Sequence, residues 1–230
     1  MSYGATDYFG LSNGSTVLVQ SGEFSPSYST DATVSDSNGD IRCRTKAGQT
    51  DEYSNEYKLC GGGDTNNDIN IDTFAKVGDV VNSGALWLHV TSISVSTSNS
   101  EEPTLSITGI AEDSTTSHNT YSFGETVRAK KVAQTFGLVA LDTGNYATAG
   151  SIEISGNTST VEDSQGDIVC REPYGYRLTA SNTLQNCTSA PTATADTANS
   201  WNLDNPIGLS STNTDYESVS VEVFKDLTKD

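Results

Sequence analysis

Apolar and polar residues alternate along short parts of the chain, and a period of two is typical of a β-strand with one buried face. The alternation occurs in four stretches: 86–95, 104–109, 152–154 and 219–223. In the last of them, valines at 219, 221 and 223 alternate with Ser220 and Glu222. Clusters of turn-forming residues such as 98–103 separate the stretches. The pattern predicts an all-β fold.

Two local features modify this prediction. In the first stretch, Leu86, Leu88 and Val90 share one face at even-numbered positions, whereas Ile93 and Val95 continue at odd-numbered positions, so a β-bulge is expected near Thr91 and Ser92. Residues 126–134 form the one stretch whose composition is compatible with a helix.

An internal repeat is the strongest feature of the sequence. Thr33–Cys60 aligns with Thr160–Cys187 without gaps, and 13 of 28 positions are identical. The identities include two cysteines and a Gly-Asp pair, which chance similarity between Ser/Thr-rich tracts would not match. Positions that this alignment pairs are equivalent positions of the repeat. The repeat predicts two tandem homologous β-sandwich or β-barrel domains at 9–125 and 136–230, with an N-terminal arm at 1–8 and a linker at 126–135.

Each copy of the repeat begins with a turn motif. Asn-Gly within Asp36–Asp40 and Gln-Gly within Asp163–Asp167 favour tight turns just before an Ile-x-Cys-Arg strand. Further glycines, at 48 and 175, lie near the middle of the segments that follow. Residues 40–60 and 167–187 are therefore expected to form long hairpins.

In such hairpins, Cys43 and Cys60 would lie on neighbouring strands, as would Cys170 and Cys187. Two interpretations remain open, namely buried free thiols or one disulfide in each domain. The chain contains no Cys-x-x-Cys spacing, which makes a zinc site improbable.

The composition is rich in hydroxyl groups and in negative charge. The chain contains 31 Ser and 30 Thr, and its 30 acidic and 12 basic residues give a formal net charge of −18. Proteins that bind nucleic acid neutralise phosphates with Lys and Arg, so this chain is not expected to bind DNA, although DNA could slide past it. No transmembrane stretch and no signal peptide are recognised, which predicts a protein that stays in the cytoplasm where it is made or leaves by a route that the sequence does not show.

The sequence contains no recognisable catalytic motif. It has neither a Gly-x-Ser-x-Gly elbow nor a phosphate-binding Gly-x-x-x-x-Gly-Lys, and its two histidines, His89 and His118, belong to no known motif. A non-enzymatic protein is therefore expected, without an obligatory cofactor.

Calcium is the one ion for which the sequence offers candidate ligands. Oxygen-bearing side chains occur at every second position of one loop: Asp64, Asn66, Asp68, Asn70 and Asp72. Calcium binds six to eight such oxygens. However, the corresponding second loop, 188–194, lacks them, and Asx-rich turns are common. Both a calcium site and a plain turn-rich loop remain open.

The basic residues are few and two groups of them are candidates for subunit contacts. Arg128, Lys130 and Lys131 cluster in the linker, where they are either solvated or bound to an acidic patch on a neighbouring copy. Arg42 and Arg44 follow the first turn motif on the face expected to point outward.

The strand pair Leu88–Val95 and Thr104–Gly109, the open loop between its strands, and the long segments 40–60 and 167–187 resemble virion structural proteins of tailed bacteriophages, especially tail-tube proteins. The resemblance implies a β-sandwich subunit that forms rings stacked into a tube around a DNA channel. It implies homo-oligomeric trimer or hexamer rings, other virion proteins as partners, DNA that passes without specific binding, no membrane, and assembly into a virion in the host cytoplasm.

Two alternative functions remain open. One is a capsid decoration protein. The other is a tandem surface-binding or adhesin module for carbohydrate, stabilised by calcium, in which Tyr53, Tyr57, Tyr174 and Tyr176 would stack on sugar rings.

Overall fold

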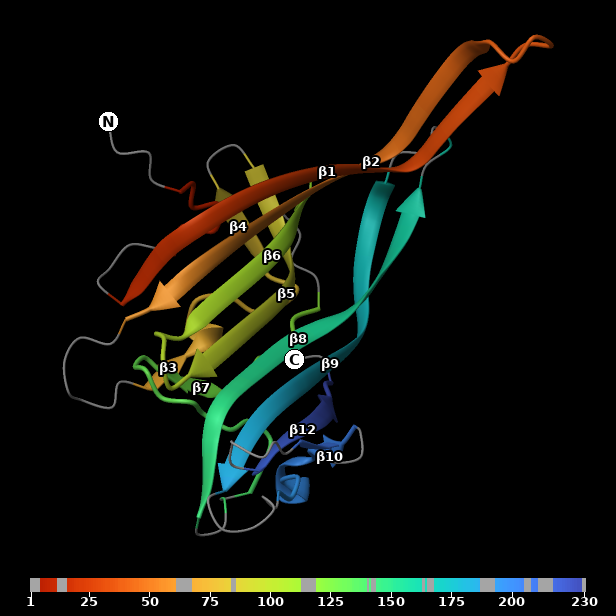
Figure 1. The fold of residues 1–230 in the computed structure, drawn as a ribbon. Helices are drawn as coiled ribbons and strands as arrows, with labels where there is room; N and C mark the ends of the chain where they lie inside the picture. The colour runs from red at the N-terminus through yellow and green to blue at the C-terminus, as the bar shows by residue number, and fades with distance from the viewer. Residues whose placement is uncertain are drawn as a thin grey trace.

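A computed structural model describes most of the chain (Figure 1). The described residues are 5–11, 16–60, 68–83, 86–112, 119–139, 141, 144–162, 164, 168–186, 193–204, 208–210 and 217–228.

The described residues form twelve strands, two short 3-10 turns and no α-helix, so the all-β prediction is confirmed. The strands are β1 (Val17–Ser35), β2 (Ile41–Leu59), β3 (Asp68–Asn70), β4 (Val80–Ser83), β5 (Leu86–Ser98), β6 (Thr104–Glu112), β7 (Thr126–Arg128), β8 (Asn145–Glu162), β9 (Ile168–Asn186), β10 (Asn202–Leu203), β11 (Gly208–Ser210) and β12 (Glu217–Asp226). The 3-10 turns are η1 (Ile71–Thr73) and η2 (Thr197–Asn199).

Ten of the strands form one antiparallel sheet, in the order β1-β2-β6-β5-β8-β9-β12-β10, with β4 added to β5 and β11 added to β12. Strands from both sides of the predicted linker belong to this sheet, because β5 pairs directly with β8. Figure 1 shows the sheet passing without a break from red β1 to blue β12 and β10. The remaining strands, β3 and β7, form a separate small sheet.

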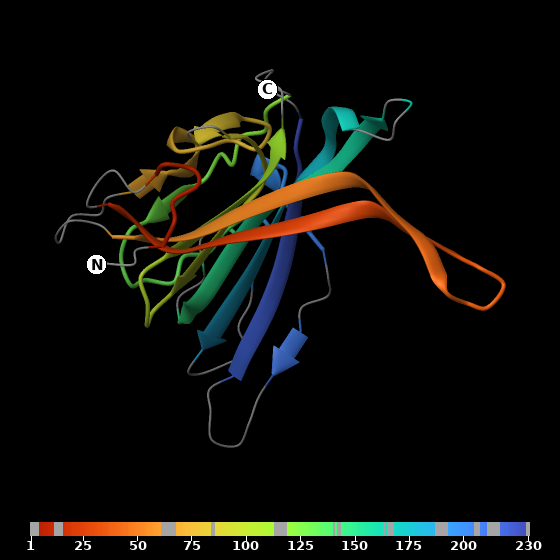
Figure 2. The same ribbon diagram turned by 90° about the horizontal axis from the view of Figure 1, so that it is seen from above.

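The long hairpins differ from the sequence prediction. The first runs from Val17 to Leu59 and turns at 36–40, so the expected turn within 40–60 is wrong. β9 likewise crosses 168–186 as one strand. The turn at Gly48 does not form because β1 pairs with β2 along its whole length and uses the backbone hydrogen bonds there. The distal half of this hairpin projects from the body in both views (Figures 1 and 2).

The corrected hairpin also changes the interpretation of the cysteines. Cys43 lies near the start of β2 and Cys60 follows its end, roughly 55 Å away at about 3.3 Å per residue. A disulfide requires Cα atoms within about 7 Å, so the predicted Cys43–Cys60 disulfide is wrong. Cys170 belongs to β9, and Cys187 lies outside the described residues.

Two local predictions have clear outcomes. The β-bulge is confirmed, because the β5–β6 register shifts between Val90 and Ser92. The helix at 126–134 is wrong: its first residues form β7, paired with β3. Pairing with β3 satisfies the backbone hydrogen bonds of the three-residue strand β7, whereas an isolated nine-residue helix would be marginal.

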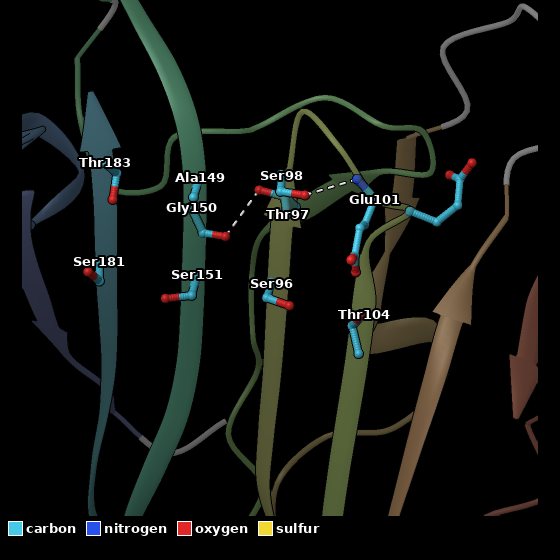
Figure 3. Close-up of a pocket in the computed structure, with 11 residues that line it drawn as sticks. Ser96, Thr97, Ser98, Glu101, Thr104, Ala149, Gly150, Ser151, Ser181 and Thr183 are labelled. Carbon is cyan, nitrogen blue, oxygen red and sulfur yellow. Dashed lines mark hydrogen bonds between the residues drawn. The ribbon is translucent and has the colours of Figure 1, made fainter. Parts of the chain in front are cut away.

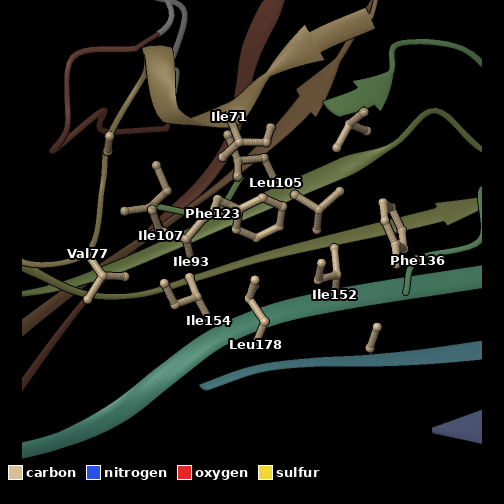
Figure 4. Close-up of a cluster of buried hydrophobic side chains, with 14 of the residues drawn as sticks. Ile71, Val77, Ile93, Leu105, Ile107, Phe123, Phe136, Ile152, Ile154 and Leu178 are labelled. Carbon is tan, nitrogen blue, oxygen red and sulfur yellow. The ribbon is translucent and has the colours of Figure 1, made fainter. Parts of the chain in front are cut away.

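One face of the large sheet carries the hydrophobic core. Alternate residues of the central strands are buried on this face, including Ile93, Leu105, Ile107, Ile152, Ile154 and Leu178 (Figure 4). A second layer covers them. It consists of residues 68–77 and 119–137, which contain the small sheet and contribute Ile71, Val77 and Phe123 to the same cluster.

Candidate functional site

The opposite face of the sheet is polar and remains accessible. Its residues alternate with the core residues and are mostly hydroxyl-bearing: Ser54, Ser94, Ser96, Thr104, Ser106, Thr108, Ser151, Ser155, Thr179, Ser181, Thr183, Ser218 and Ser220. All of them are exposed or half-buried. An antiparallel sheet with one solvated face is expected to show this alternation.

The charges on this polar face are mainly negative. Glu52, Glu56, Glu153 and Glu222 belong to it. The basic groups described there have acidic partners: the Lys58 ammonium lies 3.5 Å from Glu101, and the Arg177 guanidinium lies 2.9 Å from Asp226. The face therefore offers hydroxyls and carboxylates to a ligand rather than free cations.

A shallow hollow of about 310 Å³ opens on the polar face across β6, β5, β8 and β9. Its floor and walls are formed by Ser96, Thr97, Ser98, Glu101, Glu102, Thr104, Ala149, Gly150, Ser151, Ser181 and Thr183. Figure 3 shows hydroxyl groups from four neighbouring strands along it. The hollow marks the junction between the two halves of the sheet.

The junction itself is a strand pairing. β5 and β8 pair from Ile93 opposite Ile154 to Ser98 opposite Ala149, with Val95 opposite Ile152. The buried Thr97 reinforces the pairing, because its hydroxyl donates a hydrogen bond of 3.1 Å to the Gly150 carbonyl (Figure 3).

The linker between the two halves closes this junction. The Ala133 N–H donates to the Asn99 Oδ1 (2.8 Å), and the Gln134 N–H donates to the Thr97 hydroxyl (3.0 Å). The fully buried Asn182 then binds Phe136 twice, since its Oδ1 accepts from the backbone N–H (2.8 Å) and its Nδ2 donates to the carbonyl (3.0 Å). Residues of both halves therefore hold the end of the linker and the residue that follows it, Phe136, in place.

The N-terminal arm makes a similar contact at the start of the sheet. Asn55 is the equivalent position of Asn182 in the first copy of the repeat, and it is also buried. Its Oδ1 accepts from the Tyr8 N–H (2.7 Å), and its Nδ2 donates to the Thr6 carbonyl (2.6 Å). The N-terminal arm is thus bound to Asn55 of β2 in the same way as the chain at the end of the linker is bound to Asn182 of β9.

Two glycines permit these close approaches. A Cβ at Gly150 would lie 1.9 Å from the Gln134 carbonyl oxygen, and a Cβ at Gly22 would lie 2.3 Å from the Thr6 carbonyl oxygen. Any larger residue would force the backbone segment away. Gly150 and Gly22 lie opposite Asn182 and Asn55 in their hairpins, so each asparagine and its glycine form one clamp.

Sequence reasoning missed these clamp residues. Asn55 and Asn182 are identical at equivalent positions of the repeat, which was the available signal. Gly22 and Gly150 lie before the two aligned segments of the repeat. They are one residue further apart in the sequence than equivalent positions of the repeat are, so the ungapped alignment did not pair them.

The predicted calcium ligands are partly described. Asp64 and Asn66 lie outside the described residues. Asp72 accepts hydrogen bonds from the Phe123 and Gly124 N–H groups (2.5 and 2.8 Å), Asn70 caps η1, and Asp68 lies 3.7 Å from Arg128. The described part of this set thus makes contacts within the protein, and calcium binding stays a prediction. Within the described residues, no group of three or more His, Cys, Asp or Glu residues could hold a metal ion.

The predicted basic contact residues lie at two separate places, in and just after β7 and near the turn of the first hairpin. Arg128 is in β7 beside Asp68, and Lys130 and Lys131 are exposed just after it. Arg42 forms an ion pair of 2.5 Å with Asp36 at the hairpin turn. The side chain of Arg44 lies outside the described part of the structure.

The tyrosines proposed for sugar stacking have a different role. Tyr53, Tyr57 and Tyr176 are buried, with exposed fractions of 8%, 0% and 2%, so the stacking prediction is wrong for them. The Tyr57 hydroxyl donates to Asp7 (2.6 Å), and burial raises its pKa. Of the four, Tyr174 is exposed.

Two carboxyl groups have shifted pKa values with clear causes. Hydrogen bonds from the Asn38 N–H and from Arg42 lower the pKa of Asp36, which organises the turn at 36–40 together with the positive φ of Gly39. Burial raises the pKa of Glu125, and Asp196 adds to this effect, while Lys225 opposes it.

No protein-family model matches this chain, and a search of curated proteins found no significant match. In the described residues, no helix is long and apolar enough to cross a membrane.

Proposed function

We propose that this chain arose by duplication of a β-hairpin unit and is a non-enzymatic structural protein that assembles with itself into rings or a tube. The duplication is supported by the sequence repeat and by matching strand bounds. β2 spans 41–59 and β9 spans 168–186, which are the same interval in the two copies of the repeat. The Asn55 and Asn182 clamps occupy matching positions in these two strands.

The observation that carries the assembly proposal is the sheet itself. Within the described residues, a single sheet, with its core on one face and a polar face on the other, ends at β1 on one side and at β10 and β11 on the other, and the outer edges of these strands have no described partner strand. Such edges are templates for pairing with another chain. Repeating such a subunit around an axis lines one side of the ring with hydroxyls and carboxylates.

The role we propose is a tail-tube or related virion component whose polar face lines a DNA channel. A surface dominated by Glu52, Glu56, Glu153 and Glu222 repels phosphate, so DNA would pass along it without binding. The net charge of −18 supports the same interpretation. We propose the virion as the site of action on this basis.

The test is electron microscopy of the purified chain in negative stain, combined with mass measurement by light scattering across a range of concentrations. Rings or tubes with a central hole are expected. A homogeneous monomer at high protein concentration and high salt contradicts the proposal. A monomer that binds preformed capsids would instead indicate a decoration protein.

A further inference from the structure

The main path of the described sheet ends at β1 on one side and at β10 and β11 on the other. β1 pairs with β2, and β10 and β11 pair with β12, while their outer edges have no described partner strand. By the pairing registers given below, β1 corresponds to β8, and β11 corresponds to β5. β5 and β8 are the two strands that pair at the junction between the halves of the sheet.

The match is visible in the pairing registers. Phe24 lies opposite Tyr53 in the first hairpin, and Ile152 lies opposite Ala180 in the second, where Tyr53 and Ala180 are equivalent positions of the repeat. β1 therefore takes the same position beside β2 that β8 takes beside β9. Within this position, Phe24 corresponds to Ile152.

The other edge follows the same logic. β6 pairs with β2 in the same register as β12 pairs with β9. Thr104 of β6 lies opposite Lys58 of β2. Ser218 of β12 lies opposite Gln185 of β9, which is the equivalent position of Lys58 in the repeat. β5 then borders β6 as β11 borders β12, since Val95 lies opposite Leu105 and Leu209 lies opposite Val219. Leu209 therefore corresponds to Val95.

We propose that the outer edge of β11 in one copy pairs antiparallel with β1 of a second copy, reproducing the β5–β8 junction between molecules. Because Val95 lies opposite Ile152, the register sets Leu209 opposite Phe24 of the second copy. The flanking pairs are Gly208 with Ser25 and Ser210 with Glu23. Each copy contributes one edge of each kind, so the contact is heterologous and closes into a ring when the rotation allows it.

The exposure of the matched residues supports this pairing. Ile152, whose strand is covered by β5, has an exposed fraction of 1%, whereas Phe24, on the uncovered strand, has an exposed fraction of 45%. Both residues lie on the core face of the sheet, where the centroids of the Phe24 and Tyr53 rings are 4.9 Å apart. In the proposed pairing a neighbouring strand would cover Phe24 as β5 covers Ile152.

Pro26 supplies a second argument. The β5–β8 pairing ends at Ile93 opposite Ile154, and Pro26 follows Phe24 by two positions as Ile154 follows Ile152. Proline cannot donate a backbone hydrogen bond and stops edge pairing. The proposed ladder therefore ends where the internal ladder ends, and the rest of β1 is protected from uncontrolled pairing.

The sequence that follows β11 agrees with this correspondence. Ser96–Asn99 reads Ser-Thr-Ser-Asn, and Ser210–Asn213 reads Ser-Ser-Thr-Asn. Residues 211–213 lie outside the described part of the structure, so the proposal depends on Gly208–Ser210 and on the β1 edge alone.

Cysteine cross-linking tests the register. This inference rests on the proposed self-assembly, so the wild-type protein is first examined for assembly by light scattering. In the double variant Phe24→Cys/Leu209→Cys, mild oxidation is expected to link molecules, because Cβ atoms of opposite residues lie about 4.5–5.5 Å apart. Mixing isotope-labelled and unlabelled protein identifies links between copies by mass spectrometry of the peptides that carry F24C and L209C. The control, Leu18→Cys/Leu209→Cys, displaces one thiol by about 20 Å along the strand.

A charge at the edge tests the energetics. Phe24→Lys is expected to raise the protein concentration needed for half-assembly about tenfold or more, since it removes an apolar contact and adds a charge to the pairing. Leu18→Lys is the matched control: Leu18 is 42% exposed, and Tyr146, its counterpart in β8, is 61% exposed and lies outside the β5–β8 pairing. Thermal unfolding below the assembly concentration verifies that both variants fold.

The outcomes separate the two proposals. If the wild-type chain stays monomeric, both the self-assembly and the strand pairing are wrong. If it assembles, but F24C/L209C forms no link or links no better than L18C/L209C, only the edge pairing is wrong. The same conclusion follows if Phe24→Lys assembles as readily as Leu18→Lys.

Discussion

The Asn182 clamp is the contact whose loss should damage the fold most directly. Asn182 is fully buried, and its amide satisfies both the N–H and the carbonyl of Phe136 at 2.8 and 3.0 Å. Asn182→Ala leaves these two backbone groups without a partner inside the protein. Water cannot replace the amide easily, because Phe136 is itself 1% exposed and lies among core residues.

The magnitude follows from the two lost hydrogen bonds. A buried polar group left unsatisfied costs about 1–3 kcal/mol, so two such groups predict a loss of about 2–6 kcal/mol in the free energy of unfolding. The chain at Phe136 cannot easily move to find new hydrogen-bond partners, because the preceding linker residues Ala133 and Gln134 are bound to Asn99 and Thr97. For a chain of this size, a loss of about 3 kcal/mol lowers the Tm by about 6–12 °C.

The assay is urea unfolding of the dissociated protein, followed by the fluorescence of the buried Trp201. Asn157→Ala is the matched control, because Asn157 is an exposed asparagine on β8 of the same hairpin, where a change within about 0.5 kcal/mol is expected. If Asn182→Ala also changed the free energy of unfolding by less than about 0.5 kcal/mol, the clamp would not hold the linker as described.

Three further predictions concern neighbouring features. Asn55→Ala should increase hydrogen exchange in the N-terminal arm while lowering global stability less than Asn182→Ala, because the arm has a free end and can be solvated; equal global losses would contradict this. Gly150→Ala should lower stability by about 1–3 kcal/mol, more than the neighbouring Ser151→Ala, since its Cβ would lie 1.9 Å from the Gln134 carbonyl oxygen. Burial raises the pKa of Glu125 above 4.5, so the folded state keeps this proton to a higher pH than the unfolded state does, and wild-type stability falls as the pH rises through that range. Glu125→Gln should therefore be more stable than wild type at pH 7. Equal pH profiles of the two proteins in thermal unfolding would refute the raised pKa of Glu125.

The sequence correctly predicted those parts of the fold whose conformation is determined by residues close together in the chain. The alternation at 219–223, the bulge near Thr91 and the Asn-Gly turn at 36–40 all depend on residues within a few positions. In the turn, Asp36 accepts from the Asn38 and Asp40 N–H groups, a pattern that the local sequence favours directly.

The first hairpin was misread because its register depends on a distant strand. Gly48 is a plausible turn residue when 40–60 is considered alone. However, β1, which contains Ser, Thr, Gly or Pro at nine of its 19 positions and shows little alternation, pairs with all of β2 and leaves no room for the turn. Where a projecting hairpin is exposed on both faces, as Val34 and Ile41 are near its tip, no buried face imposes an apolar period.

The junction was beyond sequence analysis for a related reason. Thr97, Gly150 and Asn182 come from three strands, and nothing local distinguishes them from the many other small polar residues. Their importance arises from burial, since Thr97 and Asn182 have exposed fractions of 3% and 0%. In a chain with 31 Ser and 30 Thr, composition hides the few polar groups that matter structurally.

The composition favours strand edges, rather than sheet faces, as the contact surfaces of the proposed assembly. Burying the polar face under another protein layer would remove its many hydroxyls and carboxylates from water, and each would need a new hydrogen-bond partner. An edge requires no such compensation, because its backbone groups match those of an incoming strand one for one. In the proposed assembly, the Ser- and Thr-rich face remains solvated while the sheet extends from copy to copy. The low apolar content, 34% of residues, is sufficient for a sheet that buries only one face.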